Sequence, residues 1–152
     1  MKKTLFVNAK IYPVDSEPIK NGFLLIFDNI IVSLNKMLDR LPDCDEMIDL
    51  NGSVILPCII DVSKEDETEQ LDSRANYLNV KNNLEKYKNM PEELAIRSFT
   101  QDLAKEIDLD YCIGSLAEGM DATFTILTGE VFDETTQVQA VYIDGIKCEN
   151  WF

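Results

Sequence analysis

The stretch that decides the fold runs from residue 114 to residue 127 and reads GSLAEGMDATFTIL. Gly114 and Gly119 set off a tight connection, because glycine adopts the backbone conformations that tight turns require. From Ala122 to Leu127, small or polar residues alternate with β-forming ones, which is the pattern of a half-buried strand. The stretch therefore predicts a turn that leads directly into a β-strand.

These residues resemble a signature, G-S-[IL]-x-x-G-x-D-A-D-[LF], that lies near the C-terminus of metal-dependent amidohydrolases. That superfamily includes imidazolonepropionase, dihydroorotase and cytosine deaminase. The match has one departure, because Thr123 stands where the family usually has a second aspartate. The resemblance implies that the C-terminal part of this chain is the C-terminal part of an amidohydrolase-like domain.

The first 61 residues resemble the family's N-terminal block. This block usually closes with P-G-[LF]-I-D and is followed at once by the metal-binding H-x-H. Here the corresponding segment is Pro57-Cys58-Ile59-Ile60-Asp61, and it is followed by Val62-Ser63-Lys64. The two blocks occur in the family's order, one at each end of the chain.

The middle of the family's sequence has no counterpart. A complete barrel of alternating strands and helices takes about 250 residues, whereas this chain has 152 residues in all. It contains no histidine, and histidine is both the usual nitrogen ligand of catalytic zinc and the commonest general acid or base near neutral pH. The resemblance therefore implies the composite β-sandwich domain of the superfamily alone, with the catalytic barrel missing.

Hydrophobic patterning predicts a mainly β domain with some α-structure, organised as one unit over residues 1–152. Strands are expected over about 4–61 and 122–150, and a polar, acidic linker over about 64–90 takes the place of the barrel. A helix is expected over about 91–107, because Pro91 suits a first helical position and an apolar stripe follows it. Whether the linker holds a second helix stays open, since helically spaced apolar residues there are interrupted by asparagines: Tyr77, Val80, Leu84 and Tyr87. Together with these strands, the resemblance implies a small β-sandwich built from N- and C-terminal strands, with one or two helices.

Two short connections carry hairpin signals. Asp28-Asn29 and Asp144-Gly145 each separate two β-rich runs. Aspartate, asparagine and glycine tolerate the positive φ angles of two-residue hairpin turns. The sequence therefore predicts tight hairpins at both places.

Charge and composition limit the classes of partner. The chain has 28 acidic and 14 basic residues, which gives a formal net charge of -14 and repels nucleic acid and anionic membrane surfaces. No apolar run reaches the roughly 20 residues of a membrane span, and the N-terminal segment lacks the apolar region of a signal peptide. We expect a cytoplasmic protein that binds neither nucleic acid nor membranes.

Several candidate sites have simpler structural interpretations. The acidic group of residues 61–69 lacks the glycine and the alternation of a calcium loop, which favours a solvated linker. The resemblance implies that Asp121 lies at the start of a strand of the sandwich. Asp144 belongs to a predicted turn, and Ser115 has no histidine to activate it. The four cysteines show no C-x-x-C spacing, and none is assigned chemistry: Cys44, Cys58, Cys112 and Cys148. We predict no catalytic residue, no metal ligand and no cofactor.

The expected function follows from what the chain retains. It is predicted to be a non-catalytic, pseudoenzyme-like module with a structural or protein-interaction role, and to form a homodimer or bind a protein through the face left by the missing barrel. The alternative is an accessory subunit that completes a metal-dependent amidohydrolase, a C–N bond hydrolase, whose barrel is a separate chain. A small-ligand binder that uses the cleft left by the barrel is a third possibility. Trp151 and Phe152 could pack on the sandwich or contact a partner, and both interpretations stay open.

Overall fold

The structure is a computed structural model of the chain, and it describes residues 2–148. Trp151 and Phe152 lie outside the described residues. Within residues 2–148 there are eight strands and five short helices. The strands are β1 (Lys3–Ile11), β2 (Ile19–Phe27), β3 (Ile30–Lys36), β4 (Glu46–Asp49), β5 (Val54–Pro57), β6 (Phe124–Leu127), β7 (Val138–Ile143) and β8 (Ile146–Lys147). The helices are α1 (Glu67–Gln70), α2 (Ser73–Lys81), α3 (Leu84–Lys88), α4 (Glu92–Ser98) and α5 (Gln101–Glu106).

All eight strands belong to one mixed sheet in the order β3-β2-β1-β5-β6-β7-β8, with β4 paired to β1 outside this path. The N- and C-terminal strands meet where β5 pairs antiparallel with β6, from Val54 opposite Leu127 to Pro57 opposite Phe124. Both ends of the chain therefore build the same sheet. This mainly β fold confirms the predicted fold class.

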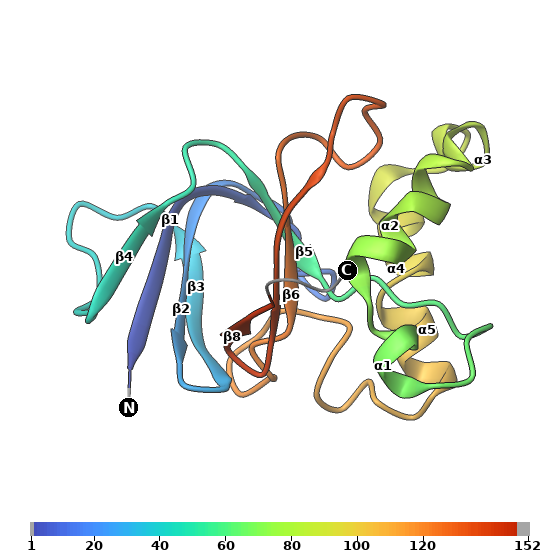
Figure 1. Ribbon diagram of the computed structural model, residues 1–152. Coiled ribbons are helices and arrows are strands. Elements are labelled where there is room, and N and C mark those ends of the chain that lie inside the picture. The colour runs from blue at the N-terminus through green and yellow to red at the C-terminus, as the bar shows by residue number, and fades with distance from the viewer. Residues whose placement is uncertain (1, 149–152) are drawn as a thin grey trace.

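Strand β1 is shared by both parts of the sheet. Its residues Thr4–Val7 pair in parallel with β4, and Lys10 and Ile11 pair in parallel with β5. Between these segments Asn8 has a positive φ of 58°, and its amide Nδ2 donates to Asp49 Oδ1 at 3.1 Å. The resulting irregularity lets the sheet curl, so that β1–β4 form one wall and β5–β8 stand beside it (Figure 1).

The space inside the curl is filled by an aromatic core. Phe6 and Phe124 are fully buried and Tyr142 is 8% exposed. Phe6 meets the other two rings edge-on at centroid distances of 5.4 and 5.2 Å, while Phe124 and Tyr142 stack at 4.9 Å. These three rings come from β1, β6 and β7, so the core holds together the two ends of the chain.

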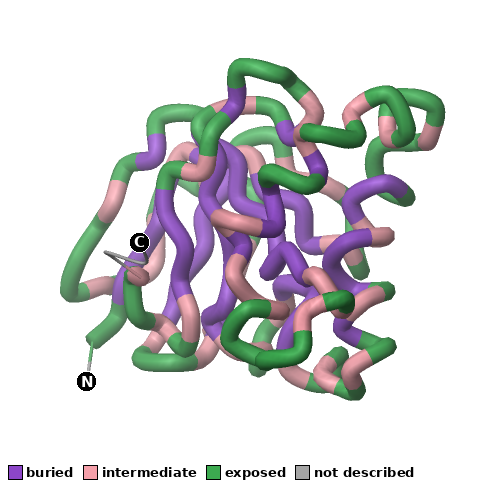
Figure 2. Tube along the Cα trace, turned by 45° about the vertical axis from the view of Figure 1, so that its right-hand side comes forward, coloured by how far each residue is buried: buried purple, intermediate pink, exposed green. Residues whose placement is uncertain are grey.

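The helices form a layer on one side of the sheet (Figure 1). Tyr77 and Val80 of α2, with Ile96 of α4 and Phe99, pack against Val54, Leu56 and Leu127 of β5 and β6. Tyr77 Oη also donates to the carbonyl of Val131 at 2.5 Å. Figure 2 shows buried residues along the strands and on parts of the helical segment. Residues 64–90, predicted as a polar linker, thus contain three helices and contribute to the core.

The helix expected over 91–107 is present as two helices. Thr100 lies between them with φ -122° and ψ -92°, outside the helical region, and its buried hydroxyl donates to the Ile96 carbonyl at 2.8 Å. The apolar stripe that predicted one helix is divided by this break. Ile96 and Phe99 pack on the β5–β6 face, whereas Ala104 and Ile107 join a separate cluster around Ile60 and Ile113.

The predicted hairpin turns are confirmed by the backbone angles. Asp28 has a φ of 51°, and Asp144 and Gly145 have φ angles of 51° and 79°. A further tight turn has positive φ at Asn51 and Gly52, between β4 and β5. These are the conformations that the turn residues tolerate. No helix among residues 2–148 is long and apolar enough to cross a bilayer.

Candidate functional site

A surface cavity of about 340 Å³ brings Asp121 and Asp144 to the same wall, beside Cys112 and Thr123. Both aspartates are placed by backbone hydrogen bonds: the Asp121 amide donates to the Cys112 carbonyl at 2.9 Å, and the Asp144 amide donates to Thr123 Oγ1 at 3.1 Å. Burial, with the nearby charge of Asp144, raises the pKa of Asp121. Burial also raises the pKa of the Cys112 thiol, and the charge of Asp121 adds to this, so the thiol is not activated as a nucleophile.

The raised pKa of Asp121 gives a testable pH dependence. A carboxyl whose pKa is higher in the folded state stabilises the fold below its ordinary pKa and loses that contribution as the pH rises through the raised value. Replacing Asp121 by asparagine removes the repulsion from Asp144 at neutral pH. We expect the variant to be more stable than the parent at pH 7, by less than about 1 kcal/mol, and the gain to shrink towards pH 4. Thermal unfolding across this range measures it, with Asp43→Asn at an exposed loop position as the control; a gain independent of pH would contradict the assignment.

The positions where the resemblance places the metal ligands hold no comparable group. Val62 and Lys64 stand at these two positions. Between them Ser63 is exposed, and its amide and hydroxyl donate to Asp61 Oδ1 at 2.9 and 2.6 Å. These hydrogen bonds lower the pKa of Asp61. Among residues 2–148 no cluster of three or more histidine, cysteine, aspartate or glutamate side chains could hold a metal ion.

The remaining sequence candidates have structural surroundings. In the acidic group, Asp66 caps α1 by accepting from the Thr68 amide at 2.7 Å, while Glu65, Glu67 and Glu69 are exposed. Ser115 is 5% exposed in the turn that leads to β6. Burial raises the pKa of the Cys58 thiol to about 12, which makes it an unreactive core residue.

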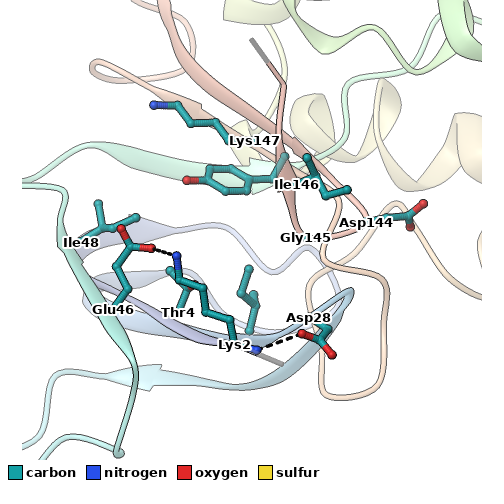
Figure 3. A pocket seen from close by; sticks show the side chains of 11 residues that line it. Lys2, Thr4, Asp28, Glu46, Ile48, Asp144, Gly145, Ile146 and Lys147 are labelled. Atoms are coloured by element: carbon teal, nitrogen blue, oxygen red, sulfur yellow. Dashed lines mark hydrogen bonds and ion pairs between the residues drawn. The ribbon is translucent and has the colours of Figure 1, made fainter.

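A larger cavity, of about 530 Å³, opens between β4 and β8 at the end of the curled sheet (Figure 3). We call it the mouth. Its apolar wall includes Ile48, Tyr142 and Ile146, and charged residues of both signs line it: Lys2, Asp28, Glu46, Asp144 and Lys147.

Ion pairing shapes the N-terminal side of the mouth. Lys2 Nζ lies 2.6 Å from Glu46 Oε1, and the Lys2 backbone amide donates to Asp28 Oδ1 at 3.0 Å. Sequence reasoning missed this site because its residues come from opposite ends of the chain. No local motif marks them, and only the curl of the sheet brings them together.

Comparison with known proteins shows the fold. No family model matches the chain, and no curated protein is similar to it in sequence. The structure is similar to an amidohydrolase from Thermotoga maritima MSB8, with a TM-score of 0.69 and 11% identity over 95% of this chain and 99% of that chain. It is similar to a Xaa-Pro dipeptidase with bound methionine in the active site, with a TM-score of 0.64 and 10% identity over 97% of this chain and 100% of that chain.

A third match is an uncharacterized protein, with a TM-score of 0.67 and 9% identity over 97% of this chain and 99% of that chain. Other matches are partial: one covers 39% of this chain and 14% of another amidohydrolase, with a TM-score of 0.33. At identities this low, a likeness of structures reports a shared fold and leaves the activity open. Residues 2–148 therefore share an amidohydrolase-like fold with these chains, in which N- and C-terminal strands build one sheet with short helices beside it.

Proposed function

We propose that this protein is a non-catalytic interaction module that forms a homodimer through the mouth of its curled sheet. The observation that carries the proposal is the mouth itself, an open cavity with an apolar wall at the ends of two short strands. Catalysis is not part of the proposal, because the chain has no histidine and the barrel positions are replaced by short helices.

The helical layer supports self-association over docking to a separate barrel. The resemblance places the start of the barrel at the end of β5. Here the Ile60 amide donates to the Phe99 carbonyl at 3.0 Å and the Asp61 amide to the Gln70 carbonyl at 3.0 Å. A separate barrel chain would have to compete with these internal contacts. This is why we place the accessory-subunit interpretation second.

The mouth offers apolar surface for a partner. Ile146 on β8 is 70% exposed and lines the mouth together with Ile48 of β4. Both strands are short and lie where the sheet is open, so a neighbouring chain can approach them. Side chains of this kind at the rim of a cavity are typical anchors of an interface.

Charge favours a second copy of the same chain as the occupant. A two-fold interface joins one surface to itself, so that surface must carry complementary groups. Two lysines and three acidic residues surround the mouth, whereas the whole chain has twice as many acidic residues as basic ones. The mouth therefore carries charges of both signs, as a surface that joins to a copy of itself requires.

Replacing Ile146 by aspartate tests the proposal. Light scattering on the purified parent protein should give the mass of a dimer, and Ile146→Asp should weaken dimerisation at least tenfold, because a charge would be buried in an apolar contact. The side chain is exposed, so the monomer should stay folded by circular dichroism. We expect no stoichiometric zinc in the same samples and no hydrolysis of amide or cyclic amide substrates.

Leu94→Asp is the matched control. Leu94 is 51% exposed on α4, outside the mouth, and its replacement should leave the dimer unchanged. A parent protein that is monomeric at high micromolar concentration would refute the homodimer. A stable complex with a barrel protein that carries H-x-H would instead support the accessory-subunit interpretation.

A further inference from the structure

A separate cavity of about 350 Å³ lies between the end of β5 and the helical layer. We call it the helix-side cavity. Its apolar wall is formed by Ile59, Val80, Phe99 and Leu103, and the first three of these are at most 4% exposed. Its volume is at the lower end of the range for small-molecule sites. The cavity shares no lining residue with the mouth.

Three asparagines line this cavity from one side. Asn76, Asn79 and Asn83 are spaced by three and four residues along α2 and its C-terminal end, so they share one helix face. Asn79 Nδ2 donates to Asp61 Oδ2 at 3.2 Å, and Asn83 Nδ2 donates to the Asn79 carbonyl at 2.7 Å. The amides therefore connect α2 to the strand end on the opposite wall.

Asn76 has an unmet hydrogen-bonding requirement. It is 2% exposed, and its Nδ2 donates to the carbonyls of Ile59 and Gln70 at 2.9 and 2.8 Å, which fixes the orientation of the amide. Its Oδ1 is buried and has no hydrogen-bond partner among the described residues. Leaving such an acceptor unpaired is unfavourable. A molecule that brings an N–H donor to this wall would recover part of that cost.

Opposite charges stand at two rims of the cavity. Asp61 follows β5, and its carboxylate accepts from Ser63 and Asn79. Lys86 on α3 is exposed, and its Nζ lies 5.4 Å from the centroid of the Tyr87 ring. Between these charges lies the apolar wall. A matching molecule would therefore carry a cation, an anion and an apolar group within a small volume.

We propose that the helix-side cavity binds a small α-amino acid with an apolar side chain. The ligand's ammonium group is oriented towards Asp61 and the Asn76 amide oxygen, and its carboxylate towards Lys86. Its side chain packs against Phe99 and Leu103. The site belongs to the segment that stands in place of the barrel, so it depends on neither a metal nor a barrel. It also functions equally in a monomer, so the failure of either proposal leaves the other standing.

Calorimetric titration with L-leucine tests this site. We expect saturable binding to the parent protein, and affinity at least tenfold weaker for Lys86→Glu, because the reversed charge repels the ligand carboxylate. Leucinamide, which lacks the carboxylate, should bind the parent more weakly than leucine does and should not be weakened by Lys86→Glu. 4-Methylpentanoate, which lacks the ammonium group, should also bind the parent more weakly than leucine.

Lys88→Glu is the matched control, because Lys88 is an exposed lysine on the same helix that does not line the cavity. It makes the same change in net charge and should keep the leucine affinity of the parent. Absence of saturable leucine binding to the folded parent would overturn the proposal. Equal loss of affinity in Lys86→Glu and Lys88→Glu would overturn it as well, since only a general charge effect would remain.

Discussion

Replacing Phe124 by alanine should lower the free energy of unfolding by about 3–5 kcal/mol, the range for removing a buried aromatic side chain. Phe124 is fully buried on β6. Its ring stacks on Tyr142 at 4.9 Å and meets Phe6 edge-on at 5.4 Å, and its loss would leave a cavity between β1 and β7. Because a domain of this size has a total stability of about 5–15 kcal/mol, the variant should be close to unfolding.

Urea unfolding followed by circular dichroism measures this effect. Tyr111→Ala is the control, since Tyr111 is 76% exposed and its removal should change the midpoint little. If Phe124→Ala lost no more stability than Tyr111→Ala, the aromatic core would not be the contact that joins the two ends of the chain.

Replacing Gly145 by alanine should destabilise the fold by at least about 2 kcal/mol, because backbone strain and a steric clash act together. Gly145 has a φ of 79°, and a Cβ atom there would lie 1.8 Å from the Asp28 carbonyl oxygen. The turns at 28–29 and 144–145 thus pack so closely that no side chain fits between them at Gly145. The Gly145 amide also donates to the Ala122 carbonyl at 2.8 Å, which ties the hairpin to the start of β6.

Gly52→Ala separates the two contributions. Gly52 has a φ of 95° and a Cβ atom there would meet nothing within 4 Å, so this variant should show only the backbone cost of about 1–2 kcal/mol. The same urea experiment compares them. Equal losses in the two variants would show that the hairpins do not pack closely at Gly145.

The helical segment shows why only part of the fold could be predicted. Hydrophobic spacing identified Val80 and Ile96 as apolar helix positions, but it carried no information on which sheet face they would cover. The break at Thr100 depends on packing, because the residues on its two sides join different clusters. Such breaks arise from tertiary contacts that local propensity does not contain.

The candidate sites, like the fold, could be predicted from the sequence only in part. The sequence showed that no histidine follows Asp61. It also predicted Asp121 at the start of a strand and Asp144 in a turn. It could not indicate that Asp121 and Asp144 share one cavity, that Lys2 pairs with Glu46, or that the Asn76 amide oxygen is buried without a donor. Each of these depends on a contact between segments that are distant along the chain.

The sequence by itself determined the β-class, the strands, the tight turns and the resemblance of both ends to an amidohydrolase domain. These follow from local rules: side-chain alternation, β-forming residues, and the tolerance of aspartate, asparagine and glycine for positive φ. Only the tertiary structure decided the curl of the sheet at Asn8, the helical layer over β5 and β6, the mouth and the helix-side cavity. Their physical cause is burial, because the sheet must cover its apolar faces, and the chain does so with segments whose partners are set by the whole fold.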